Sequence, residues 1–356
     1  MERLLLALVC NRALAPCSKR AALEWAREDV QPPGVDALGA DPQVLYRAMD
    51  FLLESEEEIQ REVFFSVANL LSLEVDVIFF DSSSTYLEIE EEDEADAEPG
   101  REGLRRLGAS KDHRPDLPQV AVGLAVTREG IPARCWVFPG NASDQLLVRQ
   151  VKDDLRAWKL DRALWVVDTG FASEESRRYL QRAGGHSIMG EKLRAGHANL
   201  EALARPGRYR QARDTLEAKE AWVGKGETRR RFVVCRNPHE ATRARARRER
   251  ALERIAEELA ALERKKTADD RRDGEALLLA RPSMGRYLAR RRGRLVVDQQ
   301  KARAEERVDG KLLLSSSDDS LAAADIALGY KQLIEVERGW RALRHALDLR
   351  PVYHRE

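Results

Sequence analysis

The apolar residues of the chain follow two different periods. Over residues 1–74 they recur at helical spacing, separated by charged segments and by proline and glycine, which predicts a region of helices. From residue 75 onward, short runs rich in valine, isoleucine and phenylalanine have the length of strands buried in a sheet. The predicted strands are 75–81, 120–126, 131–138, 164–167 and 186–190, and the predicted helices among them are 144–159 and 173–183.

The order of these elements predicts an α/β fold built on a mixed sheet. Three strands come first, the second and third joined by the hairpin 127–130, and strands and helices then alternate. This order is typical of a mixed sheet with helices on both faces. Asp81 ends the first predicted strand and Asp168 directly follows the strand 164–167, so we expect two neighbouring central strands to carry them.

Residues 191–310 interrupt this alternation and are interpreted as an insertion. Short strands at 221–223 and 231–235 are predicted to pair, and 240–267 is predicted to be a long helix, either in a solvated hairpin arm or in a coiled coil. A single final helix is then predicted from Ser320 to just before Pro351. The expected regions are a helical amino-terminal region (1–74), the first part of the core (75–190), a mixed α/β insertion (191–310) and the last part of the core (311–356).

Charge adds to this picture through its distribution. The 61 basic and 61 acidic residues cancel, although charged residues make up 34% of the chain. Acidic residues crowd 54–62 and 88–98, while basic residues crowd 229–250 and 286–303. Segregated charge suits a protein that binds a polyanion with one face, although each cluster alone is also what a solvated helix carries.

The cysteines and the apolar runs favour a cytoplasmic protein. Four scattered cysteines fit neither a disulfide framework nor a zinc site. Residues 4–10 are similar to the apolar part of a secretory signal, but Asn11-Arg12 interrupts the run and the helical spacing continues, which favours an ordinary helix. No run approaches the roughly 20 apolar residues of a membrane span, so no membrane partner is expected.

Three carboxylates are candidates for a metal site: Asp81, Asp168 and Glu337, the last set among apolar neighbours. Glu335 is roughly 200° around the helix from Glu337, so only one of the two can readily face the sheet. Carboxylates converging within ~4 Å would repel by ~4 kcal/mol per pair at an effective dielectric of ~20, unless they are protonated or bind metal. Oxygen ligands suit Mg²⁺ or Mn²⁺, and two such ions can activate the attacking and leaving oxygens of a phosphoryl displacement. Spacing alone leaves open that these are three unrelated surface acids.

Three stretches together resemble the acidic motifs of a DDE transposase of a bacterial insertion sequence. They are 79–86 (FFDSSSTY), 165–171 (WVVDTGF) and 330–337 (YKQLIEVE), and the tail 347–354 (LDLRPVYH) is similar as well. The resemblance covers nearly the whole chain and is greatest to the insertion-sequence-four superfamily. It implies a ribonuclease-H-like fold, with residues 191–310 as the insertion that such transposases carry before the glutamate.

The resemblance also implies roles for single residues. That family carries a Tyr-x2-Arg-x3-Glu-x6-Lys signature, of which Tyr330 and Glu337 match the first and third positions. Leu333 stands in place of the arginine and Arg344 in place of the lysine, which keeps the charge but changes its geometry. Asp81, Asp168 and Glu337 would be the catalytic residues and would hold two Mg²⁺ or Mn²⁺ ions. The candidate DNA-binding residues are Tyr330, Arg341, Arg344, Arg229 and Arg230, with Arg231 and 243–250 as further candidates for backbone contacts.

By this resemblance the chain would cleave phosphodiester bonds at the ends of a mobile element and join the freed 3′ hydroxyl to target DNA. It would act as a homodimer on DNA, near the bacterial nucleoid, without a small-molecule cofactor. Relatives extend beyond both ends of this sequence, so a truncated copy is expected. Two alternatives therefore stay open, a metal-dependent nuclease on the same fold and a non-catalytic DNA-binding remnant.

Overall fold

The computed structural model describes residues 2–30, 41–94, 103–111, 113–160 and 162–348. The end of the acidic stretch 88–98 and most of the tail 347–354, from 349 on, lie outside these residues. The chain divides into two compact units, Met1–Ser187 with Lys331–Glu356, and Ile188–Tyr330. None of the helices in the described part of the chain has both the length and the apolar composition needed to cross a bilayer.

The amino-terminal region of the first unit is helical, as the periodicity predicted. It consists of α1 (Glu2–Leu14), α2 (Lys19–Glu28), α3 (Pro42–Glu54) and α4 (Glu56–Leu70). Helix α2 begins at Ser18, whose side chain accepts a hydrogen bond from the Ala21 amide, and α3 begins at Asp41, which caps Gln43 in the same way. Helix α4 packs on the edge of the sheet described next.

The sheet of the first unit is mixed. Its strands are β1 (Val77–Tyr86), β2 (Gln119–Thr127), β3 (Pro132–Pro139) and β4 (Leu164–Val167), in the order β3-β2-β1-β4. Strand β1 runs antiparallel to β2 and parallel to β4. The helices of this part of the unit are α5 (Asp144–Ala157), α6 (Glu174–Leu180) and α13 (Ile334–His345).

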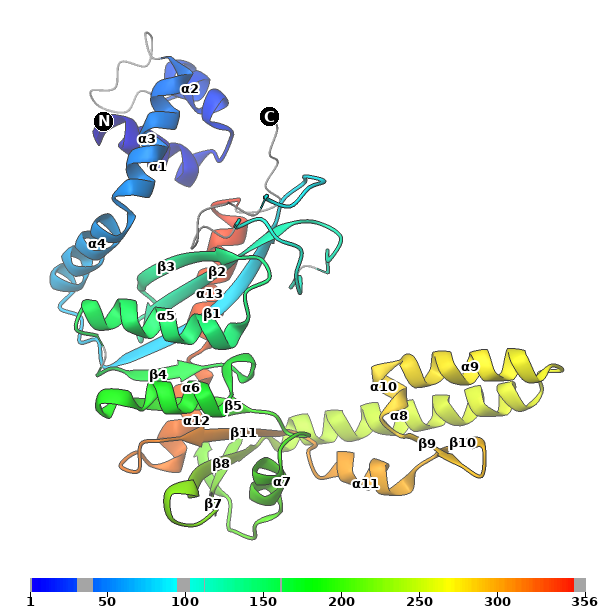
Figure 1. The fold of residues 1–356 in the computed structure, drawn as a ribbon. Helices are drawn as coiled ribbons and strands as arrows, with labels where there is room; N and C mark the ends of the chain where they lie inside the picture. The colour runs from blue at the N-terminus through cyan, green and yellow to red at the C-terminus, as the bar shows by residue number, and fades with distance from the viewer. Residues whose placement is uncertain (1, 31–40, 95–102, 112, 161, 349–356) are drawn as a thin grey trace. The chain divides into compact units, whose positions relative to one another are not determined.

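Helices cover both faces of this sheet (Figure 1). On one face the Phe80 ring meets Phe171, with 5.2 Å between ring centroids, and the Ser82 hydroxyl donates to Asp144 at the start of α5. On the other face Gly339 of α13 lies so close to Leu124 of β2 that a Cβ at residue 339 would be 3.1 Å from a Leu124 methyl. The predicted α/β fold class, a mixed sheet with helices on both faces, is therefore confirmed.

Strand β1 is longer than predicted, and Asp81 does not end it. The strand continues through the serines to Tyr86 because β2 pairs with it along that whole length, from Ile78↔Thr127 to Tyr86↔Gln119. Only its pairing with β4 stops early, at Phe80↔Val167. Asp81 therefore lies in the middle of β1, at the point where the neighbouring parallel strand ends.

The neighbouring strands of the second unit pair antiparallel. The order is β5 (His186–Glu191, from Ile188 in this unit), β11 (Lys311–Ser316), β8 (Arg230–Arg236), β7 (Leu216–Val223) and β6 (Arg210–Arg213). Helix α7 (His197–Ala204) packs on β7 and β8. The pairing of β7 with β8 confirms that prediction. Because β11 pairs with β5 and β8, residues 311–330 belong to this unit, whereas the predicted boundary was at 310/311.

A helical arm extends from the second unit's sheet. It contains α8 (Pro238–Glu263), α9 (Ala268–Ala280), α10 (Pro282–Gly285), the hairpin of β9 (Leu288–Arg291) with β10 (Arg294–Val297), and α11 (Gln299–Glu306). Its small core includes Ile255, Leu262, Leu278, Tyr287 and Leu288. Since α8 packs against α9 and β10, the arginine-rich helix forms a hairpin arm, which was one of the two predicted alternatives.

The predicted single final helix is wrong. Helix α12 (Ala323–Lys331) ends and α13 begins at Ile334. The Glu335 and Val336 amides donate to Gln332 and Leu333, at 2.8 and 3.1 Å, in place of the bonds of a continuous α-helix. Gln332 and Leu333 include neither proline nor glycine, so the sequence carries no local signal for the break.

Candidate active site

The register of the parallel pair brings the two aspartates together. The last paired residues of β1 and β4 are Phe80 and Val167, so Asp81 and Asp168 are the next residues along each chain. Asp168 keeps an extended backbone (φ −76°, ψ 171°) and directly precedes the short 3₁₀ turn η2 (Thr169–Phe171). Neighbouring strands lie roughly 4.8 Å apart, so the two carboxylates are neighbours at one end of β4.

The pKa of the Asp81 carboxyl group is raised by its surroundings. Its side chain is only 26% exposed, and burial is the main cause that raises its pKa above the usual value. The Lys111 ammonium acts in the opposite direction, while the negative charges of Asp168 and Asp144 raise the pKa further. The charged form of Asp81 thus lacks full compensation from the groups around it.

Asp81 and Glu337 line one polar cavity of about 320 Å³. Helix α13, which packs on β1 and β2, supplies Glu337 as an exposed residue. Glu335 is directed elsewhere, since it pairs with Arg338 at 2.6 Å and its carboxylate lies against Gly130 at the β2–β3 turn. The full lining of the cavity is Asp81, Ser82, Ser83, Lys111, Glu337, Trp340, Arg341, Arg344 and His345.

Basic groups share this cavity with the acids. The Arg344 guanidinium donates to the Ser83 hydroxyl on β1, and Arg341 is exposed on the same helix. Trp340 is 4% exposed, and its indole N–H is buried without a hydrogen-bond partner among the described residues. The cavity therefore combines carboxylates with cations and hydrogen-bond donors, an arrangement that suits an anionic ligand held beside acidic groups.

Sequence reasoning missed Asp144 as a member of this site. Its carboxylate accepts from the Ser82 hydroxyl at 3.0 Å and raises the pKa of Asp81. It also lies against Gly170, where an added Cβ would meet Asp144 Oδ2 at 2.8 Å. In the sequence Asp144 is an ordinary acid at a helix N-terminus, and only the packing of α5 beside β1 brings it here.

Sequence reasoning also gave Lys111 no role in the site. Its Nζ lies 3.8 Å from Asp81 Oδ1 and donates to the Ser82 hydroxyl at 3.1 Å and to the Ser82 carbonyl. Lys111 reaches β1 because the loop between β1 and β2 folds back onto that strand. The spacing of residues in the sequence does not indicate such a contact.

The acidic side chains near Asp81 are of the chemical type that binds divalent cations. Within the described ranges, no three His, Cys, Asp or Glu side chains stand close enough together to hold a metal ion. The donors are nevertheless carboxylate oxygens, which hard cations prefer. The Lys111 ammonium already takes a cation's position beside Asp81.

The remaining DNA-binding candidates lie in the second unit. Tyr330 is 9% exposed in α12, and Arg229 is exposed with its guanidinium 4.0 Å from the Trp222 ring centroid. Arg230 is half-buried, 5.7 Å from the Phe232 ring centroid.

Two further candidates for backbone contacts are structural instead. Arg231 is 5% exposed, pairs with Glu220 at 2.8 Å and donates to the carbonyl groups of Asp318 and Leu321. Arg248 is 8% exposed and pairs with Asp309. Guanidinium groups buried in this way cannot reach a DNA backbone, so the predicted roles of Arg231 and Arg248 are wrong.

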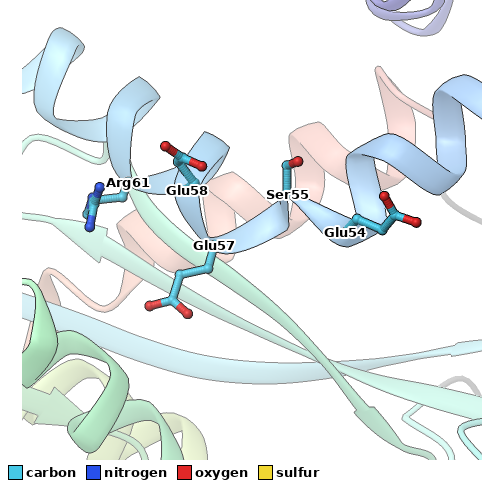
Figure 2. Close-up of a pocket in the computed structure, with 5 residues that line it drawn as sticks. All are labelled: Glu54, Ser55, Glu57, Glu58 and Arg61. Carbon is cyan, nitrogen blue, oxygen red and sulfur yellow. The ribbon is translucent and has the colours of Figure 1, made fainter.

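A second cavity, of about 400 Å³, lies where α3 meets α4 (Figure 2). Its lining is Glu54, Ser55, Glu57, Glu58 and Arg61. In Figure 2 the Glu57 and Glu58 side chains point in different directions from α4 instead of converging. This acidic junction offers no convergent donor set, so the cavity at Asp81 is the candidate active site.

No protein-family model and no curated protein matches the sequence. A piggyBac transposase in a synaptic complex with hairpin DNA is similar in structure, with a TM-score of 0.43 and 9% identity, over 96% of this chain and 57% of that one. A Mos1 transposase paired-end complex with the left transposon end matches with a TM-score of 0.22 and 10% identity, over 52% of this chain and 57% of that one.

A Mos1 mariner paired-end complex with Mn also matches, with a TM-score of 0.21 and 12% identity, over 48% of this chain and 56% of that one. The chain thus spans less than three fifths of the length of each of these structures. Because every TM-score is below 0.5, no residue role is carried over from these proteins.

Proposed function

We propose that this chain is a DDE-type transposase that cleaves phosphodiester bonds at the ends of a DNA element and joins the freed 3′ hydroxyl to target DNA. The observation that supports the proposal is a pair of adjacencies that share Asp81. Asp81 and Asp168 are adjacent across the end of the β1–β4 pair, and Glu337 of α13 lines the same cavity as Asp81. These are the three acids of the motifs that resemble the transposase family.

The proposed cofactor is a pair of Mg²⁺ or Mn²⁺ ions, held by Asp81, Asp168 and Glu337. When bound, such ions supply Lewis acidity at the attacking and leaving oxygens of a phosphoryl displacement. The chain's own residues would then orient the substrate. Arg341 and Arg344 line the cavity beside Glu337, and two guanidinium groups can hold the phosphates that flank the scissile bond.

The proposed partner is DNA, bound by a homodimer in the bacterial cytoplasm. DNA binding is supported by exposed basic side chains in each unit: Arg341 in the first unit and Arg229 in the second. Arg229 also lies over an aromatic ring, which keeps its planar group extended and available for phosphate or base contacts.

Nicking of supercoiled plasmid DNA tests the proposal with a matched pair of variants on one helix. Glu337→Gln removes a carboxylate of the cavity, and we expect Mg²⁺-dependent nicking to fall by at least about 10²-fold, the scale on which loss of one group acting on the transition state is felt. Glu335→Gln removes the same charge two residues away, where the carboxylate pairs with Arg338, and should keep the parent rate within about threefold.

Equal rates for the two variants would remove Glu337 from the site. A parent that binds plasmid DNA but never nicks it, with either Mg²⁺ or Mn²⁺, would favour the non-catalytic remnant. A parent that nicks but cannot join a labelled 3′ end to plasmid DNA would favour the nuclease.

A further inference from the structure

We propose that Lys111 is a built-in counter-ion of Asp81, and that a divalent cation must displace its ammonium group to enter the site. The inference rests on the proposed function in one respect only, that Asp81 is a metal ligand. It assigns to Lys111 a role that sets how tightly the site binds metal.

The ammonium of Lys111 occupies the place of a cation. Its Nζ is 3.8 Å from Asp81 Oδ1, 3.1 Å from the Ser82 hydroxyl oxygen and hydrogen-bonded to the Ser82 carbonyl oxygen. Ser82 in turn donates to Asp144, so the ammonium is linked to a second carboxylate through one hydroxyl. Carboxylate, hydroxyl and carbonyl oxygens around one positive charge are the ligand types that Mg²⁺ prefers.

The backbone, and not only a flexible side chain, holds Lys111 at this position. The Lys111 amide donates to the Ser84 hydroxyl on β1 at 2.9 Å. Earlier in the same β1–β2 connection, Arg106 pairs with Gln119 as an isolated β-bridge, and later in it the Arg114 guanidinium lies 5.4 Å from the Tyr86 ring centroid. The connection is thus fastened to the sheet on both sides of Lys111.

Charge makes the two cations mutually exclusive. An ammonium at 3.8 Å from Asp81 repels a divalent ion bound to the same carboxylate, so metal binding requires the ammonium to leave. The Lys111 side chain is 45% exposed, so it can turn to solvent without unfolding of the loop. Without metal, the same ammonium opposes the repulsion that Asp168 and Asp144 exert on Asp81.

The test compares Mg²⁺ binding by calorimetry, and metal-free melting temperatures, for the parent and three variants. Lys111→Met removes the ammonium, and we expect Mg²⁺ to bind roughly threefold to tenfold more tightly, the scale of a partly exposed ion pair together with relief of cation repulsion. Lys111→Arg keeps the charge and should bind Mg²⁺ within about twofold of the parent. Lys159→Met is the control for loss of a positive charge, since Lys159 is exposed and does not line the cavity.

Lys111→Met should also melt at a lower temperature than the parent without metal, and the gap should close at saturating Mg²⁺ because the metal replaces the lost charge. Unchanged or weaker Mg²⁺ binding by Lys111→Met, or equal tightening by Lys159→Met, would overturn the role of Lys111 and leave the proposed function intact. Weaker metal-free DNA binding at unchanged Mg²⁺ affinity would make Lys111 a phosphate contact instead. If neither the parent nor any variant binds Mg²⁺, the metal site itself is refuted, and this inference with it.

Discussion

Replacement of Lys152 by methionine should strongly destabilise the first unit. Lys152 lies on α5, is 3% exposed, and donates from Nζ to the carbonyl groups of Tyr179 and Arg182, at 2.9 and 3.1 Å, and of Leu180. Carbonyl groups at the end of a helix have no partner within it, so this ammonium satisfies the carboxyl end of α6. The contact fixes α5 against α6, and those two helices flank the segment that carries Asp168.

The magnitude follows from opposing terms. Three hydrogen bonds from a charged donor contribute roughly 1.5–3 kcal/mol each, or about 4–9 kcal/mol in all. Methionine has a similar length and avoids the burial of a charge, which restores several kcal/mol. The expected net loss in the free energy of unfolding is therefore about 2–4 kcal/mol.

Urea unfolding measures this loss as a lower midpoint at an unchanged slope. Lys159→Met is the matched control, because Lys159 is exposed just after the same helix and its loss should change the free energy by no more than about 0.5 kcal/mol. A Lys152→Met protein as stable as this control would refute the reasoning, since losing the three hydrogen bonds from the ammonium would then cost no stability.

Three further outcomes are expected. Gln60→Ala should lower the free energy of unfolding by roughly 1–3 kcal/mol in urea, because the Gln60 amide bonds both the N–H and the carbonyl of Cys135 on the edge strand β3, at 2.8 and 3.0 Å; an unchanged midpoint would contradict this. Without metal, Asp81→Asn should stabilise the protein near pH 7 but not near pH 4, by about 1.4 kcal/mol for each unit by which burial raises the pKa of Asp81. Because the pKa of Asp81 is higher in the folded than in the unfolded protein, its carboxyl group favours folding below the unfolded-state pKa, and this contribution is lost as pH rises through the folded-state pKa. A difference in melting temperature between Asp81→Asn and the parent that is equal at pH 4 and pH 7 would contradict this prediction. DNA binding should weaken steeply with salt, with a slope of about −0.9Z for Z neutralised phosphates, and salt-insensitive binding would remove DNA as the partner.

Local patterns predicted the elements of the fold well. The strand at 164–167 is β4 residue for residue, and the hairpin of 120–126 with 131–138 is present as β2 and β3. Burial on both faces and turn residues at the ends are local properties, which a short window of sequence carries. For the same reason the adjacency of Asp81 and Asp168 could be expected from two neighbouring strands.

The features that the sequence did not predict depend on tertiary structure. Strand β1 continues through a serine-rich stretch because β2 pairs with it there. The polar composition of that stretch gives no local signal for a strand. Lys111 and Asp144 reach the site through a returning loop and a packed helix. Arg231 belongs to a basic run in the sequence, yet a partner across the sheet and two carbonyl groups bury it. Charge in a sequence therefore says little about which arginines remain available to DNA.

The central claim is that Asp81, Asp168 and Glu337 form one divalent-metal site, and counting bound Mn²⁺ by electron paramagnetic resonance tests it most directly. The account predicts two ions bound per parent chain at saturation. It predicts that Asp168→Asn, which removes one charge at nearly constant side-chain size, loses most of this binding while its metal-free melting temperature stays level or rises. Two ions bound equally well by Asp168→Asn, or none bound by the parent, would contradict it.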